Sequence, residues 1–447
     1  MTRFDLIVRG GRLVGLPQTD IGIADGLIAD IGPDLEGNSA REIDATGAIV
    51  LPGGIDPHVH FNEPGRTEWE GWDSGSRALI AGGVTTCIEM PLNAHPPTLD
   101  HASFDAKVAA ASTSSYADFA LWGGLTPDSL PTLPELAEAG VVGFKAFMSS
   151  SGTDDFRHAD DDTLYQGMTC ASSVGLPVAV HAENDAITAG LASRARAAGC
   201  TTMRDYLDSR PVLAETEAIA RAIALAEATG CALHVVHVST GQGVALVEEA
   251  RGRGIDITCE TCPHYLAFTG EDAERIGALA KCAPPLRSSE DQEELWQLIM
   301  AGDVDMIASD HSPAPPSMKE GDDFFSIWGG ISGCQHLMPV ALTLASGHGI
   351  PPSILANLIA HNAASRFRLP NKHETIVGFD ADLVTWHPQG PAPVANIQYR
   401  HPQSAWDVFP VRYRVGHTIL RGQVVFRDGA AVGPPRGRLL MPEPSLS

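Results

Sequence analysis

The stretch GGIDPHVHFNEPGRTEWEGW, residues 53–72, begins as a short apolar strand and ends as a charged and aromatic loop. His58 and His60 stand at the point of change. Side chains two positions apart on a strand point to the same face, so both imidazoles can reach one ion. The stretch therefore predicts a strand that ends in a pair of metal ligands and is followed by a polar loop.

Seven more strand-like segments follow this one along the chain. Most are separated by stretches with apolar residues at helical spacing, such as ETEAIARAIALAEATG at residues 215–230. Eight strands in β-α alternation predict an α/β fold with a parallel (β/α)8 TIM-type barrel over residues 52–368. An open doubly wound sheet is less favoured, since no G-x-G-x-x-G follows the early strands. The eight segments are residues 53–60, 84–91, 117–124, 141–147, 176–182, 231–239, 255–262 and 304–310.

Both ends of the chain have a different residue pattern. Residues 1–51 contain short alternating segments between glycine and aspartate turns, such as IGIADGLIADIG at residues 21–32. The same pattern occurs in residues 369–447, for example in HTILRGQVVFRDG. We therefore expect the two ends to form the halves of one small β-sandwich domain beside the barrel.

The composition is that of a soluble globular protein, with 447 residues of which 44% are hydrophobic and 19% charged. The formal net charge of −25 disfavours binding to nucleic acid or to an anionic membrane, since both need basic patches. The start lacks a signal-like apolar core, and no apolar run is long enough to span a bilayer. The eight cysteines show no disulfide-framework spacing, so we expect a cytoplasmic protein. The C-x-x-C pair, Cys259 and Cys262, is interpreted as two buried strand-end cysteines.

Further ligand-type residues stand at the carboxyl ends of other predicted strands. His181 ends the fifth strand, His237 the sixth and Asp310 the eighth. The carboxyl ends of barrel strands meet at one rim, and this mix of nitrogen and oxygen ligands suits Zn²⁺ and related divalent ions. His234 lies three residues before His237, so it faces the other side of the strand and is interpreted as packing. Spacing leaves four other histidines open as ligands: His264, His311, His336 and His361.

Lys145 ends the fourth predicted strand, VVGFKAF, in an apolar setting. An ammonium group cannot bind a metal because it has no lone pair. Burial lowers the pKa of an amine, and a neutral amine can add carbon dioxide to give a carbamate whose two oxygens bridge two cations. The alternative is a lysine whose stem packs while its ammonium group pairs with an acid. The sequence favours neither interpretation.

The order of these residues resembles that of the cyclic amidohydrolases of the amidohydrolase superfamily, and the resemblance extends over nearly the whole chain. It implies an enzyme with two divalent metal ions, most simply zinc, with cobalt, manganese, nickel or iron as alternatives. It also implies a catalytic Asp310, a carboxylated Lys145 (N6-carboxylysine, which consumes CO2) and a homotetramer. One ion would be held by His58, His60 and Asp310 and the other by His181 and His237, with the modified Lys145 and a hydroxide bridging them.

The loops narrow the resemblance to one branch of that group. Dihydroorotases carry an arginine for the substrate carboxylate two residues after the second histidine, where this chain has Asn62. The segments HVHFNEPGRTEWEG, EMPLNAHPPT, KCAPPLR and WGGISG resemble those of the allantoinases. That branch implies hydrolysis of the ring amide of allantoin, a neutral small molecule, to allantoate. A hydantoinase or dihydropyrimidinase is the alternative; a non-catalytic relative is less favoured, because all six ligand positions are filled.

The same loops supply candidate substrate contacts. An amide-rich, uncharged ring needs polar partners without a full charge, and Asn62 fits that need. The positions of matching loops add four weaker candidates: Asn93, Cys282, the backbone of Ala283, and Ser312. Arg66, Glu68 and Glu70 are interpreted as residues that fix the loop, since charged loop residues usually pair or stay solvated.

Overall fold

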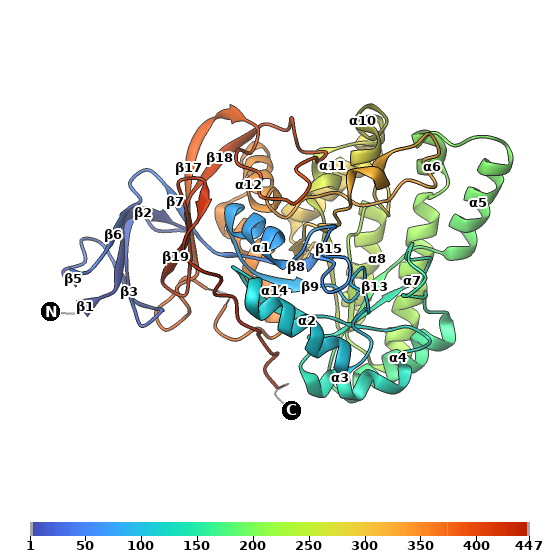
Figure 1. The fold of residues 1–447 in the computed structure, drawn as a ribbon, viewed down its shortest axis with the longest axis horizontal. Coiled ribbons are helices and arrows are strands. Elements are labelled where there is room, and N and C mark those ends of the chain that lie inside the picture. Colours follow the sequence, from blue (N-terminus) through green and yellow to red (C-terminus); the bar gives the residue numbers. More distant parts are fainter. Residues whose placement is uncertain (1–2, 373, 445–447) are drawn as a thin grey trace.

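The computed structural model describes residues 3–372 and 374–444. Its centre is a barrel of parallel strands in sequence order, which confirms the predicted (β/α)8 architecture (Figure 1). All eight predicted segments contain a strand. The strands are β8 (Gly54–Val59), β9 (Val84–Glu89), β10 (Asp118–Leu121) with its continuation β11 (Gly123–Gly124), β12 (Phe144–Phe147), β13 (Val178–His181), β14 (Leu233–Val235), β15 (Ile257–Thr261) and β16 (Met306–Ile307).

The first and last barrel strands meet through the residues that follow them rather than through a regular ladder. The His60 backbone N–H donates to the His311 carbonyl at 2.8 Å. The Ser309 backbone N–H donates to a carboxylate oxygen of Asp56 at 3.0 Å. Because these bonds join the ends of β8 and β16, they bring the first metal-ligand pair beside the last predicted ligand.

Helices cover the outside of the barrel and have well-formed N-termini. The Asp100 side chain accepts from the Ser103 N–H in a capping box, and Ser288 does the same with Asp291. The helices that follow the barrel strands are α1 (Trp72–Ala81), α2 (His101–Ser114), α3 (Leu133–Ala139), α4 (Asp161–Ser173), α7 (Val212–Thr229), α8 (Gly241–Gly252) and α11 (Ser289–Ala301). The segment after β13 also carries α5 (Asp185–Ala197) and α6 (Met203–Asp208), and the chain after β16 forms α12 (Leu337–Gly347), α13 (Pro352–Ala356) and α14 (Asn362–Arg366).

Strands from both chain ends join in one nine-stranded sheet beside the barrel, as predicted (Figure 1). The sheet has its own core, in which Val8, Ile21, Val50, Leu383 and Ile419 are fully buried or nearly so. It contains β2 (Leu6–Leu13), β3 (Gln18–Ala24), β4 (Leu27–Gly32), β6 (Glu42–Asp44), β7 (Ile49–Pro52), β17 (Leu383–Ala392), β18 (Val411–Leu420), β19 (Gln423–Arg427) and β20 (Ala430–Ala431). The architecture changes between β7 and β8; the exact domain limits at residues 51 and 368 stay a prediction.

No helix in residues 3–372 and 374–444 combines the length and the apolar character needed to cross a membrane. The cysteines of the C-x-x-C pair are fully buried, Cys259 on β15 and Cys262 at the start of α9 (Pro263–Ala267). This burial agrees with their interpretation as core residues.

Candidate metal centre

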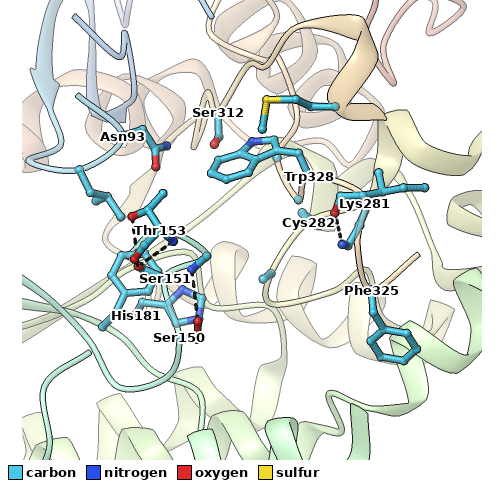
Figure 2. A pocket seen from close by; sticks show the side chains of 18 of the residues that line it. Asn93, Ser150, Ser151, Thr153, His181, Lys281, Cys282, Ser312, Phe325 and Trp328 are labelled. Atoms are coloured by element: carbon cyan, nitrogen blue, oxygen red, sulfur yellow. Dashed lines mark hydrogen bonds between the residues drawn. The ribbon is translucent and has the colours of Figure 1, made fainter. Parts of the chain in front are cut away.

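A cavity of about 920 Å³ opens at the carboxyl ends of the barrel strands. Side chains from the loops after most strands line it, including residues of the loops after β9, β12, β13 and β16 (Figure 2). Five predicted ligands are among the lining residues: His58, His60, His181, His237 and Asp310. The barrel thus brings together residues that are up to 252 positions apart in the sequence, as in other barrels whose sites lie at this face.

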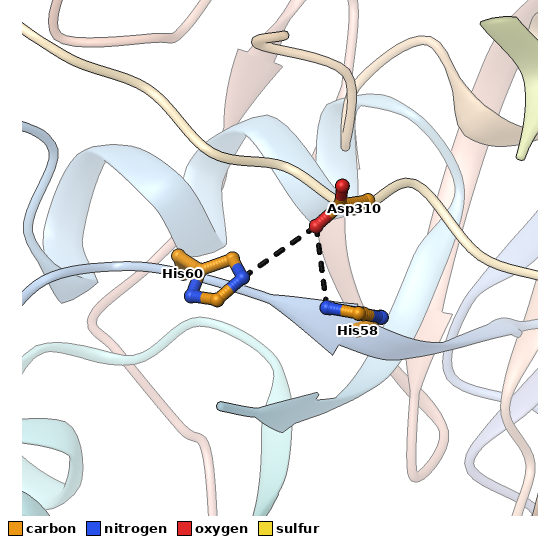
Figure 3. A group of neighbouring side chains, drawn as sticks. All are labelled: His58, His60 and Asp310. Carbon is orange, nitrogen blue, oxygen red and sulfur yellow. Dashed lines mark ion pairs between the residues drawn. The ribbon is translucent and has the colours of Figure 1, made fainter. Parts of the chain in front are cut away.

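His58, His60 and Asp310 form the first cluster (Figure 3). Asp310 Oδ1 lies 3.2 Å from His58 Nε2 and 3.5 Å from His60 Nε2. Burial alone would raise the pKa of Asp310, but the histidines and hydrogen bonds outweigh it and hold that pKa far below its ordinary value. A permanent carboxylate beside two imidazole nitrogens is a donor set that suits a divalent cation.

His181 and His237 form the second cluster on the same cavity wall. His181 Nδ1 and His237 Nε2 face each other at 3.0 Å. Burial lowers the pKa of both imidazoles, so both rings are neutral at physiological pH and each offers a lone pair. His237 Nδ1 is buried and has no hydrogen-bond partner among the described residues. This arrangement fits a second cation.

Lys145 is fully buried on β12, and its ammonium nitrogen has no hydrogen-bond partner in the part of the chain that the structure describes. Burial lowers the pKa of Lys145 to about 7. No carboxylate of the described residues forms an ion pair with it, so the alternative of a lysine paired with an acid is not found. A buried, unpaired amine that is largely deprotonated just above neutral pH is the chemical state that adds carbon dioxide.

Two buried glutamates orient the histidines, and the sequence reasoning missed both. Glu260 Oε1 accepts from His58 Nδ1 at 2.5 Å, and its Oε2 lies 3.2 Å from His234 Nε2. Glu183 Oε2 lies 2.8 Å from His181 Nε2 and also pairs with Arg210. Each carboxylate fixes the proton on one ring nitrogen and turns the other nitrogen toward the cluster. The only signal in the sequence is that Glu183 lies within HAEN, residues 181–184, and Glu260 within TCETC, residues 258–262, both at the ends of predicted strands.

Both glutamates stay ionised despite their burial. Desolvation would raise the pKa of Glu260, but His58 and His234 outweigh it and hold that pKa at about 2. For Glu183, Arg210 and His181 likewise overcome desolvation and give a pKa of about 2. His58 and His181 therefore face a carboxylate on the side away from the clusters.

Four non-glycine residues at this rim have a left-handed backbone. Their φ angles are 64° at Asn62, 66° at Asn93, 40° at His237 and 44° at Asp310. Such conformations cost about 1–3 kcal/mol and gather at functional sites. Strain at His237 and Asp310 shows that the fold holds these two side chains in place at the expense of stability.

The candidate substrate contacts differ in their positions. Asn93, Cys282, Ala283 and Ser312 line the cavity (Figure 2), and the side-chain oxygen of Asn93 is buried without a partner among the described residues. Asn62 is fully buried, and it is not among the residues that line the cavity. Both polar atoms of its side chain lack a hydrogen-bond partner in the described chain. The structure thus brings four of the five candidates to the cavity.

The EPGRTEWEGW loop folds over one side of the cavity mouth. Arg66 donates to the Asn93 carbonyl at 2.8 Å and pairs with Asp155 at 2.8 Å. Glu70 is fully buried and accepts from the Arg400 backbone N–H at 3.0 Å. Trp69 packs edge-on against Trp328 with ring centroids 4.8 Å apart. Arg66 and Glu70 thus have the structural roles that the sequence suggested, and Arg66 also lines the cavity.

The five other histidines considered in the sequence lie outside the two clusters. His234 is buried on β14, where it bonds to Thr258 and stacks on Trp122 with ring centroids 6.4 Å apart, in agreement with its interpretation as packing. It does not point away from the site, however, because it shares the Glu260 carboxylate with His58. His311 accepts from the Gly333 N–H at 3.1 Å, and His336 bonds to the Tyr399 hydroxyl at 2.8 Å. His264 is buried, and His361 lies 3.7 Å from Glu374. None of them lines the cavity.

Comparison with known proteins agrees with this geometry. The sequence pattern of the Amidohydrolase family matches residues 49–425. The allantoinase of Rubrobacter xylanophilus is 58% identical over 448 residues, and the alignment covers 99% of each chain. The allantoinase of Deinococcus radiodurans is 50% identical over 442 residues, with 98% of this chain and 99% of that protein covered.

Solved structures give the same result at the level of the fold. An L-hydantoinase (dihydropyrimidinase) from Arthrobacter aurescens superposes with a TM-score of 0.95 at 35% identity, covering 98% of this chain and 100% of that one. A D-hydantoinase (dihydropyrimidinase) from Thermus sp. gives a TM-score of 0.90 at 28% identity, with 98% and 99% covered. The resemblance predicted from the sequence is confirmed: the chain belongs to the amidohydrolase family.

Proposed function

We propose that this hydrolase opens the hydantoin ring of allantoin by metal-dependent hydrolysis of a ring amide, giving allantoate. The proposal depends on one observation. A chain that is 58% identical to an allantoinase over its whole length carries the complete set of six ligand-type residues at one barrel rim. Members of a family differ in the ring that they open, so the loops over the cavity, rather than the fold, carry the substrate assignment.

Two divalent ions fit the residues of the rim. We propose that His58, His60 and Asp310 hold one ion, that His181 and His237 hold the other, and that Lys145 bridges them after its amine has added CO2. The carbamate forms with loss of one proton from the amine nitrogen and creates a carboxylate where a neutral amine stood. Zinc is the proposed metal, since two pairs of imidazoles with a carboxylate suit it well.

Bound divalent ions at such a site supply Lewis acidity toward water and toward an amide carbonyl. Asp310 is the proposed general base, because its carboxylate lies at the cavity wall and stays ionised at every physiological pH. It takes the proton of the attacking water as oxygen adds to the ring carbonyl. The same proton then passes to the ring nitrogen as the C–N bond breaks, so one group serves as base and then as acid.

Polar groups that could bind an uncharged, amide-rich ring are present in the cavity wall. Asn93 and Ser312 offer amide and hydroxyl groups, and Cys282 and Ala283 offer backbone groups, so we propose these four as substrate contacts. Asn62, which is fully buried, is proposed to shape the loop after β8, and its direct contact with substrate stays a prediction. No arginine stands at the position that binds a substrate carboxylate in dihydroorotases, so dihydroorotate would lack its charged partner.

Four broader expectations accompany the proposal. We propose a homotetramer, a cytoplasmic location, a role in the use of allantoin as a source of nitrogen, and a division into residues 1–51, 52–368 and 369–447. Family resemblance supports the assembly, while the scattered free cysteines support a reducing compartment. Sedimentation analysis of the purified protein tests the assembly, and a mass near that of one chain would contradict it.

A hydantoinase or dihydropyrimidinase is the second candidate, favoured by the TM-score of 0.95 to a protein of that activity. The test is hydrolysis of allantoin, hydantoin, dihydrouracil and dihydroorotate by the metal-loaded protein, with Asp310→Asn as the inactive control. We expect allantoin to be hydrolysed with the highest kcat/KM. Faster hydrolysis of another ring would reject the allantoin assignment, and full activity of Asp310→Asn would reject the proposed base.

A further inference from the structure

Lys281 differs from the other cationic side chains that line the cavity. Each of the three arginines of the lining has a carboxylate partner, whereas none lies within ion-pair distance of Lys281 Nζ in the described chain. The three pairs are Arg66 with Asp155 at 2.8 Å, Arg196 with Asp323 at 3.0 Å, and Arg210 with Glu183. Lys281 is therefore an amine without a carboxylate partner in the wall of the site.

The surroundings of Lys281 leave part of its bonding capacity unused. The residue is only 4% exposed, and its Nζ lies 4.5 Å from the centre of the Tyr206 ring. The ammonium group has three N–H donors but donates to a single acceptor in the described residues, the Ile327 carbonyl. Figure 2 shows Lys281 beside Cys282, across the view from Asn93 and His181. Burial lowers the pKa of Lys281 to about 7, and in either protonation state the amine keeps at least one N–H donor for an acceptor that enters the cavity.

Lys319 also bonds to residues near Ile327, but it differs from Lys281 in the number of its hydrogen bonds. Its ammonium donates to three carbonyls, those of Ala278 at 3.2 Å, Trp328 at 3.0 Å and Gly330 at 2.6 Å. All of its donors are used, and it does not line the cavity. Lys319 therefore has the geometry of a cation that fixes the loop, whereas Lys281 keeps donors for a ligand.

The position of Lys281 relative to the ligand clusters defines what it can contact. The Tyr206 hydroxyl donates to the Cys282 carbonyl at 3.0 Å. The guanidinium carbon of Arg210 lies 5.4 Å from the centre of the Tyr206 ring. Arg210 in turn pairs with Glu183, the partner of His181. Lys281 thus belongs to the wall that begins at the second cluster, but several side chains separate it from the reacting centre.

We propose that Lys281 is a specificity residue that donates a hydrogen bond to the carbonyl oxygen of the ureido arm of allantoin. This inference rests on the proposed function and names a contact that distinguishes allantoin from plain hydantoin. The amide of the ring has to reach Asp310 for hydrolysis, so the arm extends toward the remaining walls of a cavity of about 920 Å³. Allantoate keeps the arm, so Lys281 contacts substrate and product alike.

The test compares two ligands that share the ring and differ in the arm. Equilibrium binding to the metal-loaded protein, measured by calorimetry, and steady-state kinetics are determined for allantoin and for unsubstituted hydantoin. Lys281→Met keeps an unbranched apolar side chain and removes all donors, whereas Lys281→Gln keeps a neutral donor. Lys319→Met is the matched control, because it removes a lysine that holds the loop but does not line the cavity. Loss of one hydrogen bond to a charged group lowers the affinity for a ligand by about 10- to 100-fold.

We expect Lys281→Met to lower the affinity and kcat/KM for allantoin by that factor while those for hydantoin change by no more than about twofold. Lys281→Gln should fall between wild type and Lys281→Met, and it keeps the test decisive if Lys281→Met does not fold. Equal losses for both ligands, as expected for Lys319→Met, would overturn the contact and assign Lys281 to the loop. Wild-type protein that binds but does not hydrolyse allantoin would reject the proposed function, while the binding data still decide the role of Lys281.

Discussion

The Glu260→Gln substitution tests whether the buried carboxylates control metal affinity. Gln has the same shape, so the change removes the negative charge that His58 Nδ1 and His234 Nε2 face, at 2.5 and 3.2 Å. His58 then loses the partner that holds its proton on Nδ1 and keeps Nε2 free for a cation. The histidine side chain itself remains, so any loss of metal is due to its orientation and basicity.

The size of the effect follows from the electrostatics of the pair. The pKa of Glu260 is held at about 2, against an ordinary value of 4.5. This difference corresponds to a preference for the charged form of about 3 kcal/mol. Removal of an outer partner of a ligand histidine typically lowers metal affinity about 10- to 100-fold. We expect Glu260→Gln to fall in that range.

The assay is a competition for zinc between the protein and a chelator of known affinity, read as the number of ions retained per chain. Glu215→Gln is the matched control, because Glu215 is equally buried but pairs with Arg287 and bonds to Ser239 instead of a ligand histidine. The control should retain the wild-type affinity. If Glu260→Gln also retains it, the carboxylate does not tune the ligand and the reasoning is refuted.

Four further results are expected. We expect the intact wild-type protein to carry the added mass of a carboxyl group, and Lys145→Met to lack this addition and to bind fewer ions; a wild-type mass without the addition would contradict the carbamate. Lys107→Met leaves the buried carboxylate of Glu89 without the cation that pairs with it among the described residues, so the free energy of unfolding should fall by about 3–5 kcal/mol in urea denaturation. Burial lowers the pKa of His336 to about 3, so its contribution to stability is complete above the unfolded-state pKa of about 6.5 and declines as the pH falls toward 3. In urea denaturation at a series of pH values, His336→Gln should therefore reduce the acid-induced loss of unfolding free energy by up to about 5 kcal/mol. Removal of the metal by a chelator should lower Tm, and readdition of zinc should restore it.

The main elements of the fold could be predicted from local patterns. The first, fifth, sixth and eighth predicted strands carry at their ends ligand-type residues that line the cavity, because the carboxyl ends of parallel barrel strands meet at one rim. His58, His60, His181, His237 and Asp310 were therefore found by their position at strand ends alone. The strand-like pattern at both chain ends was enough to predict that they share one β domain, and their strands do join in one sheet.

The parts that could not be predicted depend on long-range orientation. Glu183 and Glu260 look like ordinary strand-end acids, and only the fold turns them toward histidines on other strands. Asn62 seemed to face the substrate, but it is fully buried and outside the cavity lining. Lys281 and Lys319 could not be distinguished in the sequence, because their difference lies in how many carbonyls surround each ammonium group.

We propose that two divalent ions, joined by a carboxylated lysine, make this chain an allantoin hydrolase. Titration of metal-free protein with zinc, with and without bicarbonate, while allantoate formation is followed, tests this proposal most directly. We expect activity to require bicarbonate during reconstitution and to rise until two ions are bound per chain. Full turnover of allantoin by the metal-free protein, or a plateau at one ion, would contradict it.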